Sequence, residues 1–142
     1  MRARYLLDTN IASFIIKGAS AALDHRLMGV SMAHLAISAI TEGELRCGVA
    51  PLPQATRLHS LIDSLIEEFL LRVTVLPWDS DCAQRYGLLR ATLEREGRPM
   101  GNLDMMIGAH ALALKLILIT NDRAFERIKG MKIEDWTKAV SG

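Results

Sequence analysis

The chain has 142 residues, of which 50% are hydrophobic and 23% are charged, a composition that excludes a disordered or fibrous protein and predicts one globular domain over residues 1–142. Its 17 Lys and Arg residues nearly balance its 16 Asp and Glu residues, so a strongly basic nucleic-acid-binding protein is not indicated. The N-terminal residues lack the apolar run of a signal peptide, and no apolar stretch is long enough to span a bilayer. We therefore expect a cytoplasmic protein with no membrane contact, and two reduced, mostly buried thiols at Cys47 and Cys82.

Short apolar runs alternate with helical patterns along the whole chain. Strands are predicted at residues 5–7, 35–38, 73–76 and 116–119, with a short fifth strand at 132–133. Helices are predicted at residues 9–16 and 21–28, from the end of the second strand to about residue 49, and at 54–71, 79–94 and 102–114, with Asp79 and Asn102 as candidate N-caps. This alternation predicts an α/β fold, a three-layer α/β/α sandwich with a central parallel sheet.

Polar side chains follow two of these strands directly. The first strand is followed by Asp8-Thr9-Asn10 and the fourth by Thr120-Asn121-Asp122. Helix capping explains either group by itself, because Asp, Thr and Asn all favour N-caps. Ligands of open parallel sheets bind beyond the carboxyl ends of the strands. If the two strands are neighbours, Asp8 and Asp122 face each other across one crevice.

Two further carboxylates are expected to point toward protein rather than solvent. Glu44 shares a helix face with Ile40, Cys47 and Gly48, whereas Glu42 lies on the opposite side with Arg46 at i+4. Asp104 lies in the first turn of its helix, and its neighbours on that face are Ile107, Gly108 and Ala111. Interaction with the helix dipole is the simpler interpretation of Asp104, although it does not explain an inward direction.

Four unpaired carboxylates at one edge of a sheet would repel one another, and a hard divalent cation relieves that repulsion. Mg²⁺ and Mn²⁺ prefer carboxylate and water oxygens, and both support phosphodiester hydrolysis. Asp8, Glu44, Asp104 and Asp122 are therefore the candidate metal ligands and catalytic residues, with one or two metal ions equally compatible with the sequence.

Four motifs in order resemble the PIN-domain nucleases. They are Leu7-Asp8-Thr9-Asn10, then Ile37-Ser38 with Glu44-Leu45 and Gly48, then Gly97 to Gly101 with Asp104, Ile107 and Ala109-His110-Ala111, then Thr120-Asn121-Asp122 with Phe125. More closely, they resemble VapC toxins of type II toxin–antitoxin modules, including the FitB-like subgroup. The resemblance covers essentially the whole chain and makes residues 1–142 a single PIN domain.

The resemblance implies a Mg²⁺- or Mn²⁺-dependent endoribonuclease that leaves a 3′-hydroxyl and a 5′-phosphate. Asp8 and Asp104 would be the principal metal ligands, and Glu44 and Asp122 would complete the site or help to activate water. Thr9 and Thr120 would hydrogen-bond the carboxylates or bound waters, with Asn10 and Asn121 as polar support.

The implied partners are a cognate VapB-type antitoxin, an RNA substrate that includes transfer RNA in related proteins, a second copy of the chain, and operator DNA reached only through the antitoxin complex. One position departs from the family pattern, because many relatives carry an acid where this chain has Ala124.

Other charged or polar residues have weaker claims to a functional role. Arg98 and Arg123 adjoin site motifs and are the best candidates for phosphate contact. Arg85, Arg90 and Arg95 are more simply explained as an exposed helix face. The four histidines lack metal-ligand spacing and are interpreted as structural, with His110 the least certain of them.

Two alternatives remain open on the same α/β scaffold. A receiver-like phosphoacceptor fits poorly, since only one acid ends the first strand and the third strand runs into Pro77-Trp78. A catalytically idle interaction module is the other alternative, and the complete set of four acids argues against it.

Overall fold

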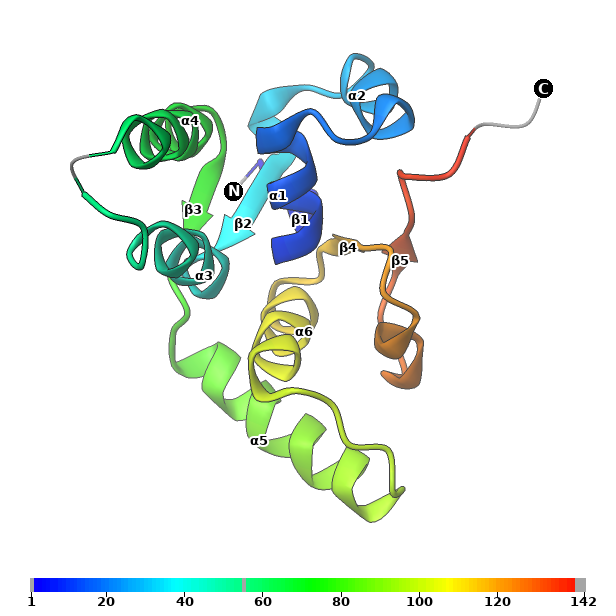
Figure 1. Cartoon of the computed structure of the whole chain (residues 1–142). Coiled ribbons are helices and arrows are strands. Elements are labelled where there is room, and N and C mark those ends of the chain that lie inside the picture. The colour runs from blue at the N-terminus through cyan, green and yellow to red at the C-terminus, as the bar shows by residue number, and fades with distance from the viewer. Residues whose placement is uncertain (1, 55, 140–142) are drawn as a thin grey trace.

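The computed structural model describes residues 2–54 and 56–139, so residues 1, 55 and 140–142 of the predicted domain lie outside the described residues. Five parallel strands form one sheet (Figure 1), and their bounds are β1 (Tyr5–Leu7), β2 (Leu35–Ser38), β3 (Thr74–Leu76), β4 (Ile117–Ile119) and β5 (Ile133–Glu134). The predicted parallel sheet is therefore confirmed, and the fifth strand begins one residue later than expected.

The strand order is β3-β2-β1-β4-β5, which places β1 at the centre. Its three residues pair with Leu35–Ile37 of β2 on one side and with Ile117–Ile119 of β4 on the other. The chain builds outward from β1 in one direction with β2 and β3, and in the other with β4 and β5. The order therefore reverses between β1 and β4, and open sheets bind ligands at such a point. A receiver module has the order 2-1-3-4-5, so this topology excludes the receiver-like alternative.

Six α-helices cover the sheet in the described part of the chain. Their bounds are α1 (Thr9–Lys17), α2 (Ala21–Leu27), α3 (Ala39–Val49), α4 (Arg57–Arg72), α5 (Ser80–Arg95) and α6 (Asn102–Leu114), with short 3₁₀ helices η1 (Met32–His34) and η2 (Arg123–Arg127). α4 begins three residues later than predicted because the Thr56 hydroxyl caps it by accepting the His59 N–H.

The predicted cap of α5 is confirmed, and that of α6 is wrong. Asp79 accepts the Cys82 N–H at 3.2 Å, and this bond lowers the pKa of Asp79 below its ordinary value. At α6 the N-cap is Gly101, which has no side chain to contribute, and Asn102 is already the first helical residue.

Alternate residues of each strand face opposite sides of the sheet and form two hydrophobic layers. Leu6, Ala36 and Leu118 pack under α5 and α6, whereas Leu7, Ile37 and Ile119 pack under α1, α3 and α4. This is the expected three-layer sandwich, and Figure 1 shows α5 and α6 together in its lower half, with α1, α2 and α4 in its upper half. Phe125 and Trp136, which are both almost fully buried, close the two layers near β5.

The prediction of two buried thiols is half right. Cys82 is buried, and burial raises the pKa of its thiol, whereas Cys47 is exposed because it lies on the outer face of α3. The two sulfurs form no disulfide. Within residues 2–54 and 56–139, no helix is both long enough and apolar enough to cross a membrane.

Candidate active site

Asp8 ends β1 and begins α1, and it is 4% exposed. Its Oδ1 accepts the Ile11 N–H at 2.8 Å, which is the N-cap bond of α1. Its Oδ2 accepts the hydroxyl of Thr120, the first residue after β4. Asp8 is therefore both a helix cap and a link to the neighbouring strand, so its capping and functional interpretations are compatible.

Thr120 connects the Asp8 carboxylate to the backbone of Asp122. Its Oγ1 donates to Asp8 and accepts the Asp122 N–H at 3.0 Å. Asp122 in turn caps η2, because its Oδ1 accepts the Ala124 N–H at 2.9 Å. Because β1 and β4 are neighbours in the sheet, the two motifs that follow them meet as predicted.

Glu44 reaches the same place from α3. The Thr9 hydroxyl donates to its Oε1 at 2.6 Å and lies 3.1 Å from the Thr41 hydroxyl. The expectation that an apolar face turns Glu44 inward is wrong, since Cys47 and Gly48 are exposed. A hydroxyl on α1, rather than the composition of α3, holds this half-buried carboxylate, whose charge acts on Asp104.

Asp104 completes the group from the first turn of α6. Burial raises the pKa of Asp104, and the charges of Asp122 and Glu44 raise it further. The predicted packing face is confirmed, because Ile107, Gly108 and Ala111 are all buried. The carboxylate itself is half-buried, at the point where this packed face of α6 opens toward the other acids.

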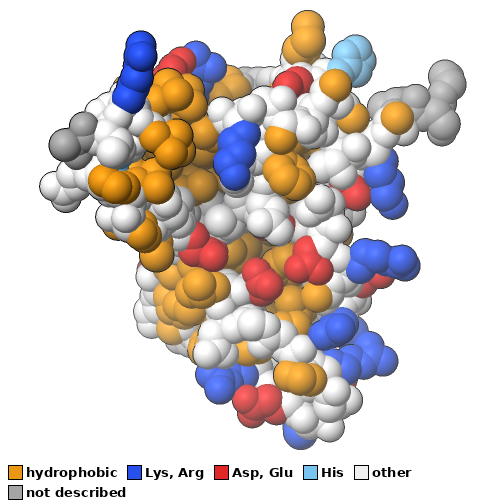
Figure 2. Space-filling view, viewed as in Figure 1, with side chains coloured by type: hydrophobic (Ala, Val, Ile, Leu, Met, Phe, Trp, Pro, Cys, Tyr) orange, Lys and Arg blue, Asp and Glu red, His pale blue; other side chains and the backbone are white. Residues whose placement is uncertain are grey.

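Mutual repulsion marks this site electrostatically. Burial raises the pKa of Asp8 from 3.8 to about 6, the bonds from Thr120 and Ile11 partly oppose that rise, and the charges of Asp104 and Asp122 add to it. The acids therefore act on one another, and every charge among the largest causes of these two shifts is that of another acid. Figure 2 shows acidic side chains near the middle of this face, with Lys and Arg along its right and lower margins.

The four carboxylates are gathered without converging on one point. In the described part of the chain, no three His, Cys, Asp or Glu side chains form a set that could hold a metal ion as they stand. Three of the acids are instead engaged by local donors, namely Thr9, Thr120 and the backbone of Ala124. The donor set of four carboxylates at a topological switch point still suits a hard divalent cation, which would compensate their repulsion.

The remaining predicted site residues lie at the surface. Asn10 and Asn121 are exposed, and Asn121 lines a hollow next to Asp122. Arg98 and Arg123 are also exposed, and the nearest acid to Arg123 is Glu126 at 3.9 Å. Exposure of both arginines near the site leaves them accessible to a ligand.

A buried pair next to the site was not predicted. His110 is fully buried on α6, and its Nδ1 lies 2.8 Å from the Ser38 hydroxyl at the end of β2. Its Nε2 has no partner among the described residues, and burial lowers the pKa of the ring. The signal that could have found the pair is the one used for Thr120, a hydroxyl directly after an apolar strand.

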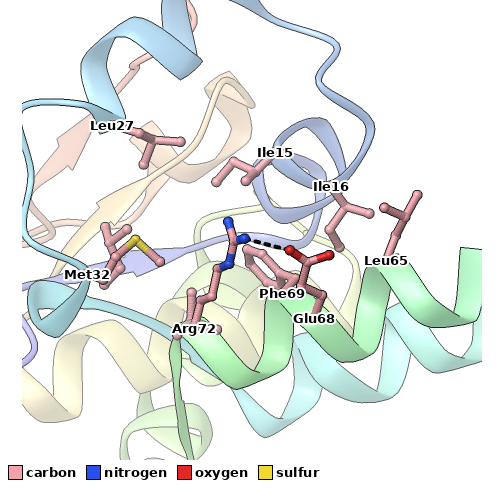
Figure 3. Close-up of a pocket in the computed structure, with 10 residues that line it drawn as sticks. Ile15, Ile16, Leu27, Met32, Leu65, Glu68, Phe69 and Arg72 are labelled. Atoms are coloured by element: carbon pink, nitrogen blue, oxygen red, sulfur yellow. Dashed lines mark hydrogen bonds and ion pairs between the residues drawn. The ribbon is translucent and has the colours of Figure 1, made fainter.

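An apolar groove lies away from the carboxylates, between α1, the segment around η1, and α4. Its volume is about 280 Å³, and Ile15, Ile16, Leu65 and Phe69 are among its lining residues. Figure 3 shows Arg72 and Glu68 within it, joined by an ion pair of 2.5 Å. None of the four carboxylates lines this groove.

Comparison with known proteins agrees with this geometry. The family model described as "PIN domain" matches residues 5–131. A protein of Shigella flexneri, named tRNA(fMet)-specific endonuclease VapC, is 37% identical over 135 residues that cover 94% of this chain and 98% of the relative.

Solved structures extend the comparison to the fold. VapBC2 of Rickettsia felis, bound to a DNA fragment from its promoter, aligns with TM-score 0.83 and 32% identity over 93% of this chain and 98% of the neighbour. FitAB bound to a DNA fragment aligns with TM-score 0.82 over 96% and 98%, and at 23% identity it shows the fold alone. The chain therefore belongs to the PIN-domain family, and the curated relatives that it matches over nearly their whole length are VapC proteins.

Proposed function

We propose that this chain is a divalent-metal-dependent endoribonuclease and the toxin of a type II toxin–antitoxin module. The observation that carries the proposal is a group of carboxylates in which Asp104 and Asp122 raise the pKa of Asp8, and Asp122 and Glu44 raise that of Asp104. The ribonuclease names of the VapC relatives support the activity, and the complexes of the structural neighbours support the toxin role.

The cost of this arrangement without a cation argues for a function other than stability. A carboxyl group as buried as Asp8 is costly to ionise unless an opposite charge compensates it. The largest effects of charge on Asp8 come from other acids, because Asp104 and Asp122 raise its pKa further. A purely structural cap would need one acid here, not four, so charge compensation by Mg²⁺ or Mn²⁺ is the interpretation that we favour.

In this proposal Asp8 and Asp104 are the principal metal ligands, and Glu44 and Asp122 complete the site. A bound divalent cation polarises phosphoryl oxygens and lowers the pKa of water, which is the chemistry that phosphodiester hydrolysis needs. Thr9 holds Glu44, and Thr120 holds both Asp8 and the backbone of Asp122, so these hydroxyls orient the acids.

The exposed side chains around the acids fit the remaining roles. Asn10 and Asn121 supply polar support at the rim, and Arg98 and Arg123 contact phosphates of the RNA. Since Ala124 carries no carboxylate and Glu126 lies 3.9 Å from Arg123, Asp122 is the acid that this segment supplies to the site, and its Oδ1 already accepts the Ala124 N–H.

The biological context is proposed from the relatives. The substrate is RNA, with transfer RNA as the first candidate because of the Shigella flexneri relative's name. A VapB-type antitoxin neutralises the protein, the basic unit is a homodimer, and operator DNA is contacted only through the antitoxin complex. Light scattering of the purified chain tests the homodimer.

The catalytic proposal is tested by RNA cleavage with Mg²⁺ or Mn²⁺. The wild type should cut transfer RNA, excess chelator should stop it, and Asp8→Asn should reduce the rate at least about 100-fold. Asp63→Asn is the matched control, because Asp63 is an exposed acid on α4 outside the site. Equal cleavage by wild type and Asp8→Asn would sink the assignment.

The toxin role needs a separate measurement. Expression of the wild type should arrest growth of a bacterial host, co-expression of the antitoxin should restore it, and Asp8→Asn should be harmless. If the wild type cleaves RNA in vitro but its expression does not arrest growth, the toxin role is contradicted and the nuclease proposal still stands.

A further inference from the structure

Three hollows on the α5–α6 side of the molecule adjoin one another through shared lining residues. The first, of about 410 Å³, and the second, of about 230 Å³, share Arg85, Leu112 and Lys129. The second and a third, of about 370 Å³, share Arg127. We call these three adjoining hollows together the basic groove, after their six cationic lining residues, Arg85, Arg98, Lys115, Arg127, Lys129 and Lys132.

The basic groove concentrates positive charge. Glu96 is the single acid among its lining residues, so six cations and one acid give a formal charge of +5, whereas the whole chain carries +1. The rest of the molecule is accordingly net acidic. A hollowed surface of one sign raises the local concentration of ligands of the opposite sign.

Several arginines elsewhere in the described residues are neutralised by acids, and those of the groove are not. Arg46 pairs with Glu42 and Glu67, and the other pairs are Arg26–Glu134, Arg72–Glu68 and Arg90–Glu94. Of the six groove cations, only Lys129 has an acid within 4.0 Å across the part of the chain that the structure describes, and Glu96 is 3.9 Å away. Such uncompensated charge opposes folding through self-repulsion, and a bound polyanion relieves it.

The groove leads toward the four carboxylates. α6 spans 13 residues, or about 20 Å, and groove residues flank it in the chain at both of its ends. Lys115 lies at the C-terminal end of α6, and the Arg98–Pro99 loop precedes its N-terminal end, only a few residues before Asp104. The Arg127 guanidinium donates to the Pro99 carbonyl at 2.9 Å and so ties η2 to this loop.

We propose that the basic groove binds the phosphate backbone of the RNA on one side of the scissile bond. This inference rests on the proposed nuclease function and adds a binding site to it. A strand that follows these hollows meets cations from Lys132 and Lys115 to Arg127 and Arg98, in the loop that precedes Asp104 in the chain. RNA fits better than an acidic peptide, because its charge repeats along the whole path and the path ends at the acids that would act on phosphodiesters.

The test compares two double variants with the same change in net charge. Arg85→Gln/Lys132→Gln removes two exposed groove cations, and Lys17→Gln/Arg57→Gln removes two exposed cations on α1 and α4, across the sheet. Binding of fluorescein-labelled unfractionated transfer RNA is measured by anisotropy at several salt concentrations, with Asp8→Asn added to each protein to prevent cleavage. KM and kcat are measured in proteins that retain Asp8.

The groove variant should raise the Kd and the KM about tenfold at low salt and leave kcat within about twofold, since phosphate contacts position the nucleic acid. The logarithm of the association constant decreases linearly with the logarithm of the salt concentration, and the magnitude of this slope should fall by about 1.4 to 1.8. This corresponds to about 0.7 to 0.9 for each cation removed from the phosphate backbone. The control variant should stay within about twofold of wild type.

Three outcomes separate the claims. Equal effects of the two double variants would overturn the groove proposal while wild-type cleavage leaves the nuclease proposal intact. Absence of cleavage by the wild type would remove the nuclease proposal. Polyglutamate is also tested as a competitor of transfer RNA. If it displaced transfer RNA at a concentration well below that at which a nonspecific polyanion does so, the groove would be reassigned to an acidic peptide and its assignment to RNA would be overturned.

Discussion

Replacing Asp8 with Asn should make the metal-free protein more stable at pH 8. Burial holds the pKa of Asp8 at about 6 instead of 3.8, so the folded state disfavours the ionised carboxylate. The difference corresponds to about 3 kcal/mol at a pH well above 6, at about 1.4 kcal/mol per pKa unit. An Asn amide keeps an oxygen for the Ile11 N–H and removes the charge, so most of this free energy is regained.

The direction of the pH dependence follows from the raised pKa. Above about pH 6 the wild type carries the full cost of an ionised Asp8, and this cost decreases as the pH falls toward 3.8. The advantage of Asp8→Asn should therefore be greatest near pH 8 and small near pH 4.5. Because both proteins share every other titrating group, their difference reports Asp8 together with its coupling to Asp104 and Asp122.

Thermal and urea unfolding in excess chelator, at pH values from 4.5 to 8, measure this difference. For a domain of this size about 3 kcal/mol corresponds to a rise in Tm of about 9 °C. Added Mn²⁺ should stabilise the wild type and leave Asp8→Asn unchanged, which reverses the order of the two proteins. A variant that is less stable at pH 8, or a difference that does not vary with pH, would refute the reasoning.

Three further predictions concern residues around this site and in the core. Thr120→Val should reduce the rate of RNA cleavage about 10- to 100-fold with little loss of fold, since Val has no hydroxyl to orient Asp8; a rate within twofold of wild type would contradict this role. Phe125→Ala should lower the free energy of unfolding by about 3–5 kcal/mol in urea titrations, because the ring is 1% exposed in the layer under α6; a decrease below about 1 kcal/mol would show that the layer repacks. Burial lowers the pKa of His110 below 6.5, so wild-type stability should fall more steeply than that of His110→Gln between pH 6.5 and 5; parallel curves from urea unfolding would argue against a buried neutral ring.

The fold was predictable from the sequence because its signals are local. Apolar runs of three or four residues, such as those before Asp8 and Thr120, mark strands that helices cover on both faces. Polar residues directly after those runs then mark the carboxyl edge of the sheet. The meeting of Asp8 with Asp122 needed one further fact, that β1 and β4 are neighbours, which the structure supplies.

Features that depend on contacts between distant segments were not predictable in the same way. The direction of Glu44 is set by Thr9, 35 residues away, and not by the residues of its own helix. Asn102 is of a residue type that favours N-caps, and it was therefore predicted to cap α6. In the structure, Gly101 is the N-cap and Asn102 is the first residue of the helix. The basic groove joins residues from α5, α6 and η2, and along the sequence its arginines resemble an ordinary exposed helix face.

The central claim, that the four carboxylates hold the divalent cation on which RNA cleavage depends, is tested most directly by one Mn²⁺ titration. Binding of Mn²⁺ and the rate of transfer RNA cleavage are followed over the same concentration range for the wild type, Asp104→Asn and Asp63→Asn. We predict that binding and cleavage rise together in the wild type and in Asp63→Asn, and that both are abolished in Asp104→Asn. Cleavage by Asp104→Asn at the wild-type rate, or Mn²⁺ binding unaffected by that substitution, would contradict the account.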